Sequence, residues 1–399
     1  MTSKGARGMS EGSVRSRRSA SEAGTPGASS APGDDDGRAS GAVGQGDEPA
    51  TDAGSDGQDE RPGADDATVV VGEGRVAALV REALGGRGPE RAPAESNDLA
   101  APWVEGARTV VVVAPAGEFG IRALKGETRR AFLVEQARRV ARAAAAHGVR
   151  QVVAVTSAMV HGASADRPVV EDAEPVSPDA AGFVADLVAF EEALADELDL
   201  VDEPVLLAVL RPAVVVGPEV DTILTRHFEA PRLLVVKGSE RPWQLVHTDD
   251  LAAAVRLVAA EGRSGAFTVG ALDEHGEPDV VTPAELVERT GLATVSLPAA
   301  TAFGAAERLH RVGVLPSPAS DMAFVVHPWT VSAHGLHEAG WAPAWSSAEC
   351  VDVLMDGVRG RIAVGGRRVG GRDAAALGAA GAAVALLGTA AIWRQARRR

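Results

Sequence analysis

Tyrosine is absent from this 399-residue chain, and cysteine occurs once, as Cys350. Without tyrosine, no phenol hydroxyl can give or take a proton in any reaction that the protein performs. A single cysteine excludes an intramolecular disulfide framework and a cysteine-based zinc site, and the sequence predicts no metal site. The chain also lacks an apolar segment behind its early basic residues, so we expect no secretory signal and a cytoplasmic protein.

Positive charge is also in short supply. The sequence has 40 Lys and Arg against 55 Asp and Glu, which gives a net charge of −15. This balance argues against recognition of nucleic acid, because the nucleic-acid backbone is itself an anion. Hydrophobic residues make up 45% of the chain, which is enough for the core of one large α/β domain with appendages.

The two ends differ from the middle in composition. Residues 1–66 have almost no apolar anchors, so they cannot offset the entropy of ordering, and we expect a disordered tail. Residues 356–372 read as a Gly/Arg linker, and residues 373–399 as an apolar helix with a basic end. Residues 374–393 carry no charge and are numerous enough to span a bilayer. Both a tether to the inner face of the cell membrane and a soluble helix remain open.

Between these ends, short apolar runs alternate with stretches of helical periodicity. Residues 67–71 (ATVVV), 109–114 (TVVVVA) and 152–155 (VVAV) are too short for helices and read as strands that are buried on both faces. The alternation predicts an α/β fold with a Rossmann-like, doubly wound parallel sheet over residues 67–355. A small C-terminal α/β substrate lobe is expected mainly in residues 218–245 and 271–355.

A glycine-rich turn joins the first predicted strand to the first helix. Gly72, Gly74 and Ala77 form a G-x-G-x-x-A pattern, in which the backbone can approach a pyrophosphate that the helix N-terminus holds. The placement favours dinucleotide binding over a plain strand-to-helix turn. Residues 88–95 contain no apolar run, so the second strand of such a fold is predicted to be missing, together with the acidic residue that holds the adenosine ribose.

The chemistry of the chain is expected at residues 152–162, VVAVTSAMVHG. This strand ends in small polar residues, and the carboxyl edge of a parallel sheet is where ligands collect. If the protein is an enzyme, Ser157 should face the reacting atoms. His161 has an ordinary pKa that suits proton transfer, although we favour a structural or pocket-lining role for it.

Four segments in a fixed order carry a resemblance. They are VVAVTSAMVHG at 152–162, LRPAVVVGP at 210–218, WQLVHTDDLAAAV at 243–255 and AFTVG at 266–270. They resemble the extended short-chain dehydrogenase/reductase superfamily, in particular the NAD-dependent epimerase/dehydratases typified by UDP-galactose 4-epimerase. GFVADLVAFE at 182–191 is most similar to an atypical actinobacterial subgroup that lacks the family's Tyr-x-x-x-Lys motif.

The resemblance implies NAD or NADP as cofactor and a small-molecule ligand such as a nucleotide sugar, and it is compatible with a homodimer. It makes Ser157 the catalytic serine, which hydrogen-bonds the reacting oxygen of the substrate. It also assigns cofactor contacts to nine positions: Gly72, Gly74 and Ala77 at the phosphates, Asp98 and Leu99 at the adenine, Ala114 and Pro115 along the cofactor, and Pro212 and Ala213 near the nicotinamide.

The sequence departs from the family where the chemistry lies. The family's proton transfer needs a tyrosine and, four residues on, a lysine that lowers the tyrosine pKa. Here these positions fall on Phe183 and Leu187, and the family's phosphate-gripping arginine falls on Trp243, with Arg241 nearby.

Two hypotheses follow. The first is an NAD(P)-binding Rossmann protein that is catalytically degenerate and whose cofactor binding is weakened or lost. The alternative is an active NAD(P)-dependent oxidoreductase or epimerase that acts on a nucleotide-sugar-like molecule through Ser157 and a non-standard acid/base.

Overall fold

The computed structural model describes residues 68–93, 101–118, 128–229, 232–239, 241–311, 323–358, 361–364 and 367–370. The predicted tail at residues 1–66 and the predicted apolar helix at residues 373–399 lie outside these ranges. Within them, no helix combines the length and the hydrophobicity that a membrane span requires.

The central sheet has five parallel strands in the order β1-β2-β3-β5-β9. They are β1 (Thr68–Val71), β2 (Thr109–Val113), β3 (Gln151–Val155), β5 (Leu206–Pro212) and β9 (Gly265–Val269). The first three strands are rich in valine and buried along almost their whole length. Such runs are typical of parallel strands that are covered on both faces.

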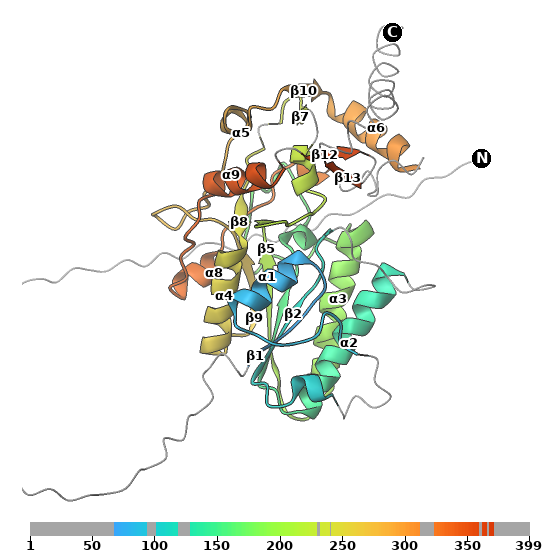
Figure 1. Cartoon of the computed structure of the whole chain (residues 1–399), viewed down its shortest axis with the longest axis vertical. Helices are drawn as coiled ribbons and strands as arrows, with labels where there is room; N and C mark the ends of the chain where they lie inside the picture. The colour runs from blue at the N-terminus through green and yellow to red at the C-terminus, as the bar shows by residue number, and fades with distance from the viewer. Residues whose placement is uncertain are drawn as a thin grey trace, which may run out of the picture. The chain divides into compact units, whose positions relative to one another are not determined.

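Four helices cover this sheet, two on each face (Figure 1). They are α1 (Arg75–Ala83), α2 (Arg129–Ala146), α3 (Gly182–Asp199) and α4 (Thr248–Glu261). Val111 belongs to the core that includes α1 and α4, whereas its neighbour Val110 belongs to the core that includes α2 and α3. This alternation confirms the predicted α/β fold with a doubly wound, Rossmann-like parallel sheet.

The remaining elements are short. They are β4 (Val169–Val170), β6 (Val214–Val216), β7 (Leu233–Val236), β8 (Leu245–His247), α5 (Pro283–Thr290), β10 (Thr294–Leu297), α6 (Ala299–Arg311), α7 (Ala323–Val326), β11 (Thr330–Val331), α8 (His334–Glu338), α9 (Ser347–Val358), β12 (Arg361–Val364) and β13 (Arg367–Gly370). Parallel pairs join β6 to β8, β7 to β10 and β4 to β11. β7 and β10 come from the two segments that were assigned to the substrate lobe.

The stretch with a linker-like composition, residues 356–372, contains regular structure. Helix α9 continues to Val358, and β12 pairs with β13 in an antiparallel hairpin. The Gly and Arg content suggested a linker, but residues 361–364 pair with residues 367–370, with Ile362 opposite Val369.

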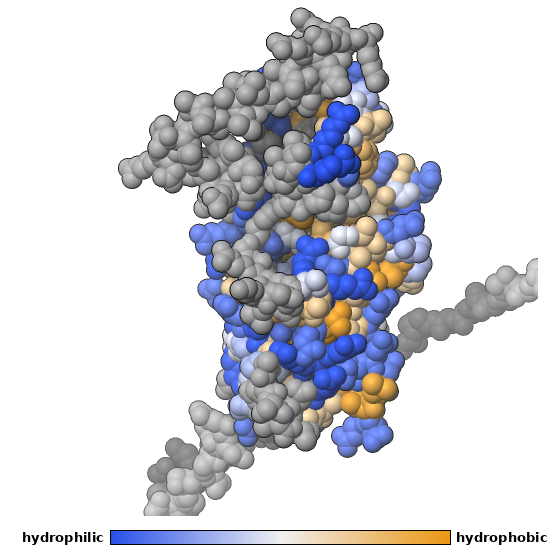
Figure 2. Space-filling model, turned by 90° about the vertical axis from the view of Figure 1, so that its right-hand side faces the viewer, coloured by the Kyte–Doolittle hydropathy of each residue, from blue (hydrophilic) through white to orange (hydrophobic). Residues whose placement is uncertain are grey.

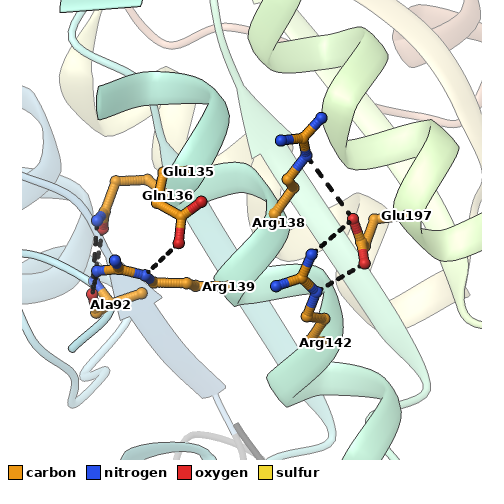
Figure 3. Close-up of polar contacts among 7 residues, drawn as sticks. All are labelled: Ala92, Glu135, Gln136, Arg138, Arg139, Arg142 and Glu197. Carbon is orange, nitrogen blue, oxygen red and sulfur yellow. Dashed lines mark hydrogen bonds and ion pairs between the residues drawn. The ribbon is translucent and has the colours of Figure 1, made fainter. Parts of the chain in front are cut away.

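Among the residues that the structure describes between β1 and β2, no further strand joins the sheet. In place of a second strand, only an isolated bridge joins Val69 to Arg87 among the described residues there. After this bridge, the backbone of Ala92 forms hydrogen bonds with the side chain of Gln136 in α2. The Ala92 N–H donates to Gln136 Oε1 at 2.7 Å, and Gln136 Nε2 donates back to the Ala92 oxygen at 3.5 Å (Figure 3). The edge of β1 itself is bonded to residues 87–89, since the N–H of Val70 donates to the Arg87 oxygen at 2.7 Å and the N–H of Gly72 to the Pro89 oxygen at 3.4 Å. Gln136 satisfies the backbone of the segment that follows them.

Ion pairs link the outer sides of α2 and α3. Arg142 Nε lies 2.7 Å from Glu197, and Arg138 approaches the same carboxylate at 3.8 Å (Figure 3). Arg129 pairs with Asp186 at 2.6 Å near the other end of the helices. Among the coloured residues of the face drawn in Figure 2, hydrophilic side chains predominate and hydrophobic ones lie between them.

Helix α4 begins earlier than the apolar pattern indicates. The sequence predicts a helix at residues 251–260 that is capped by Asp249 and Asp250. In the structure the cap is His247, whose Nδ1 accepts from the Asp249 N–H at 3.2 Å. Asp250 lies within the first turn and instead accepts the N–H groups of Ala344 and Trp345 at 2.8 and 3.1 Å. It fastens the segment before α9 to α4.

Candidate functional site

A small cavity lies at the carboxyl edge of the central sheet. Its volume is about 30 Å³, which is room for one or two water molecules. The cavity is lined by Val76, Val113, Ala114, Ala116, Glu118, Val155, Thr156, Ser157, Met159, Pro212, Ala213, Val214, Val215, Thr222 and Leu224. Four of the residues that the sequence singled out, Ala114, Ser157, Pro212 and Ala213, therefore share one cavity.

The other predicted site residues lie elsewhere. Gly72, Gly74 and Ala77 form the turn and first helical residues beside the cavity, and Pro115 follows Ala114 in the chain. His161 belongs to the 3₁₀ helix Ala158–His161 and does not line the cavity. The proposed adenine contacts, Asp98 and Leu99, lie outside the described residues.

The two glycines of the turn meet different steric demands. A Cβ at Gly72 would lie 2.8 Å from both the Ala77 Cβ and the Val113 oxygen, so glycine is needed for close packing of α1 on the sheet. Gly74 has φ of 98°, a conformation that side chains rarely adopt. A Cβ at Gly74 would lie 2.6 Å from Glu118 Oε2.

Glu118 was not foreseen from the sequence, and its carboxylate lies on the N-terminus of α1. Its Oε1 accepts from the N–H of Arg75 at 2.9 Å and from the N–H of Val76 at 3.1 Å. These amides are the first two of the helix, where an anion is favoured by the unsatisfied N–H groups and the helix dipole. The cleft side of the glycine turn is thus filled by a carboxylate of the same chain.

Burial nevertheless disfavours the charged form of Glu118. Desolvation raises the pKa of this carboxyl from 4.5 to about 7, although the two backbone hydrogen bonds act in the opposite direction. Asp221 adds a smaller repulsion of the same sign as burial. An ionisable group that titrates near neutral pH therefore lines the same cavity as Ser157.

Ser157 stands where β3 gives way to the 3₁₀ helix. Its side chain is 4% exposed, and its Oγ accepts from the N–H of Met159 at 3.3 Å. The hydroxyl therefore caps this short helix and still lines the cavity. Among the described residues, no hydrogen bond joins its Oγ to a side chain that could act as a base.

A buried polar network lies next to Ser157. Thr156 donates its hydroxyl to Glu191 Oε1 at 2.6 Å, and Glu191 forms an ion pair of 2.7 Å with Arg211. Both charged side chains are about nine-tenths buried. The signal for this pair was present in the sequence as a glutamate on the inward face of α3 and an arginine at the end of β5, but their proximity follows from the topology.

His161 is joined to this network and has both ring nitrogens engaged. Its Nδ1 lies 3.1 Å from the Pro175 oxygen and its Nε2 lies 3.3 Å from Arg211 Nη1. Because the carbonyl can only accept and the guanidinium can only donate, Nδ1 carries the proton and Nε2 accepts. Burial, with the nearby Arg211 charge, lowers the pKa of His161 to about 4. This geometry describes a neutral, structural histidine.

The positions of the family's tyrosine and lysine are part of the core. Phe183 is 3% exposed and Leu187 is fully buried. The Phe183 ring lies against Gly117, so that a Cβ at that glycine would be 3.5 Å from the ring. Neither side chain can carry a proton. Both belong to the apolar core, and the Arg129 guanidinium carbon lies 5.8 Å from the centroid of the Phe183 ring.

Arg241, which lies near the position of the family's phosphate-binding arginine, is buried and packs against aromatic side chains. It is 5% exposed, its guanidinium carbon lies 3.6 Å from the centroid of the Trp243 ring, and its Nε donates to the His327 oxygen at 3.1 Å. Burial lowers its pKa to about 9. Neither Arg241 nor Trp243 lines the cavity at the sheet edge.

Comparison with known proteins gives relatives in sequence and in structure. No protein-family profile matches the chain. An uncharacterised protein of Mycobacterium tuberculosis is 27% identical over 222 residues, which cover 54% of this chain and 56% of the relative. The match thus spans little more than half of either protein.

Solved structures agree over a longer stretch. UDP-N-acetylglucosamine 4-epimerase from Bacillus cereus is 14% identical and superposes with a TM-score of 0.51 over 74% of this chain and 100% of its own. MoeE5 in complex with UDP-glucose and NAD is 16% identical, with a TM-score of 0.52 over 73% of this chain and 98% of its own. The described part of the chain has the fold of the extended short-chain dehydrogenase/reductases, as the sugar-nucleotide epimerases do.

Proposed function

We propose that this chain is a cytoplasmic, dinucleotide-binding member of the epimerase/dehydratase family that no longer performs the family's proton transfer. Its ligand would be NAD or NADP, alone or with a small molecule of the nucleotide-sugar kind, in the cleft at the carboxyl edge of the sheet. The observation that carries this proposal is the burial of Phe183 and Leu187, which stand in the places of the tyrosine and the lysine and are packed in an apolar core.

The rest of the site supports a binding role. Ala114, Pro212 and Ala213 line one cavity, as expected if Ala114 lies along a cofactor and Pro212 and Ala213 lie near its nicotinamide. His161, the most obvious substitute acid or base, has both nitrogens engaged and a pKa of about 4. Similarity of fold alone is a weak argument for activity, so the chemistry of the residues decides between the hypotheses.

One observation favours the alternative of an active oxidoreductase or epimerase. Ser157 and Glu118 line the same cavity, and the pKa of Glu118 is about 7. A carboxyl that titrates near neutral pH is a suitable general acid or base. In that case Glu118 would exchange the proton and Ser157 would orient the oxygen of the substrate.

A combined binding and turnover experiment separates the two. The full-length protein is titrated with NADH and NADPH by fluorescence, and then incubated with NAD or NADP and UDP-glucose, UDP-galactose and UDP-N-acetylglucosamine. The proposal predicts saturable dinucleotide binding without turnover. Turnover that is lost in both Ser157→Ala and Glu118→Gln would establish the alternative. No binding at millimolar dinucleotide, by the wild type and by Glu118→Ala alike, would refute both.

A further inference from the structure

The backbone N–H groups with which a glycine-rich turn normally binds a phosphate donate here to the side chain of Glu118. We infer that Glu118 is an internal substitute for the pyrophosphate, so that a dinucleotide can enter the cleft only after this carboxylate has left the N-terminus of α1. The inference rests on the proposed function, because it concerns the same cleft and the same class of ligand.

The positions of the two hydrogen bonds carry the inference. In a G-x-G-x-x-A turn, the amides that follow the second glycine face the phosphates. Here these are the amides of Arg75 and Val76, and both donate to Glu118 Oε1. A phosphate oxygen and the carboxylate would need the same two N–H groups, so their binding is mutually exclusive.

The main chain around Glu118 holds the carboxylate in this place. Glu118 forms an antiparallel bridge with Thr222, and the N–H of Ile223 donates to the Gly117 oxygen at 3.1 Å. Gly74 leaves the room that the side chain needs, since a Cβ there would lie 2.6 Å from Glu118 Oε2. The contact is therefore built by two backbone segments that are distant in the sequence, and does not depend on a freely rotating surface glutamate.

The substitution for phosphate is incomplete. Glu118 Oε1 takes both amides, whereas Oε2 is buried and has no hydrogen-bond partner in the described part of the chain. Arg75, the nearest cation on the helix, directs its Nε to the Pro218 oxygen and lies 4.0 Å from Glu219. A buried acceptor without a partner is unfavourable, so the carboxylate is a ligand that a better one can displace.

The size of the cavity points in the same direction. About 30 Å³ remains beside Glu118, whereas pockets for ligands of cofactor size have volumes of several hundred Å³. The cavity that the described residues form beside Glu118 is therefore too small, as it stands, to hold a dinucleotide. If the open form is a minor fraction of the molecules, the apparent affinity falls by that fraction.

Titration of four full-length proteins tests the inference. The wild type, Glu118→Ala and Glu118→Gln are titrated with NADH, NADPH and inorganic pyrophosphate. Glu219→Gln is the matched control, because it removes one negative charge near the same end of α1 from a side chain that is 69% exposed. We expect Glu118→Ala to bind dinucleotide at least about tenfold more tightly than the wild type. Glu118→Gln should fall between these two, and the control should equal the wild type.

The other outcomes are distinct. Equal and tight binding by the wild type and Glu118→Ala would overturn the internal substitute and leave the proposed function intact. Pyrophosphate binding that appears only in Glu118→Ala, without binding of NADH or NADPH, would uphold the substitute and overturn the dinucleotide as ligand. If no variant binds any of the three probes, both proposals are wrong.

Discussion

Glu118 and the amide of Arg75 are joined by a hydrogen bond of 2.9 Å across 43 residues of sequence. This contact connects the end of the second strand to the glycine turn after the first, at the point where proteins of this fold place a cofactor phosphate. It also places a carboxyl group with a pKa of about 7 in a cavity whose other lining residues, among those that the structure describes, have no acidic or basic side chain.

The raised pKa of Glu118 predicts a stability that depends on pH. The folded pKa of about 7 exceeds the ordinary value of 4.5, so the stabilising contribution is complete below about pH 4.5 and is lost as the pH rises through 7. Glu118→Gln cannot titrate, so its free energy of unfolding should rise relative to that of the wild type by about 2 kcal/mol between pH 5.5 and pH 8. Urea unfolding of both proteins at pH 5.5 and pH 8 measures the difference, in which the contributions of the histidines cancel. A constant difference between the two proteins would show that Glu118 has an ordinary pKa.

His161 should remain neutral throughout the physiological range. Its pKa of about 4 lies below the ordinary 6.5, because burial and the Arg211 guanidinium disfavour a second positive charge. In a ¹⁵N or ¹³C imidazole titration by NMR, its signal is expected to stay constant from pH 8 down to about pH 5, with the proton on Nδ1. A midpoint near 6.5 would contradict this prediction and would make His161 a candidate acid or base.

Removal of Arg211 should be costly. Its ion pair with Glu191 is about nine-tenths buried, and a buried carboxylate that has lost its partner destabilises the fold by about 3–5 kcal/mol. We expect Arg211→Met to lower the free energy of unfolding by this amount. The double variant Arg211→Met/Glu191→Leu should regain much of the loss, since no charge is left unpaired. Additive losses in chemical denaturation would show that the two residues are not coupled.

Gln136 is expected to stabilise the segment that contains Ala92. Gln136→Leu leaves the N–H of Ala92 without its partner, whereas the Ala92 oxygen keeps the contact of 3.5 Å with Arg139 Nη1. An unsatisfied buried donor costs about 1–3 kcal/mol. Glu135→Gln, one residue earlier on a side chain that is 39% exposed, is the control and should change the stability by less than about 0.5 kcal/mol. Equal midpoints for the two variants would indicate that water replaces Gln136 at Ala92.

Much of the scaffold follows from local sequence patterns. The runs ATVVV, TVVVVA and VVAV became parallel strands because such short valine-rich segments gain most when both faces are buried. Ser157 and Pro212 reached the same cavity because the carboxyl ends of parallel strands meet at one edge.

The contacts at the candidate site join residues that are far apart in the sequence. Glu118 reaches Arg75 because residues 117–118 are bonded to residues 222–223, and no local pattern encodes that pairing. The ion pair of Glu191 with Arg211 joins a helix to a strand 20 residues away. His247, not the aspartates that follow it, caps α4, since a histidine can accept a hydrogen bond at an N-terminus as they do.

The hydrogen bonds of Glu118 to the N-terminus of α1 can be measured without any ligand. Hydrogen exchange at the amides of Arg75 and Val76 reports their hydrogen bonds directly, and it can be followed by NMR in the wild type and in Glu118→Ala. If the carboxylate holds these amides, their exchange should be faster by about tenfold or more in the variant, while the amides in the middle of α1 keep their rates. Unchanged rates at Arg75 and Val76 would contradict the account, because the turn would then be free to receive a phosphate.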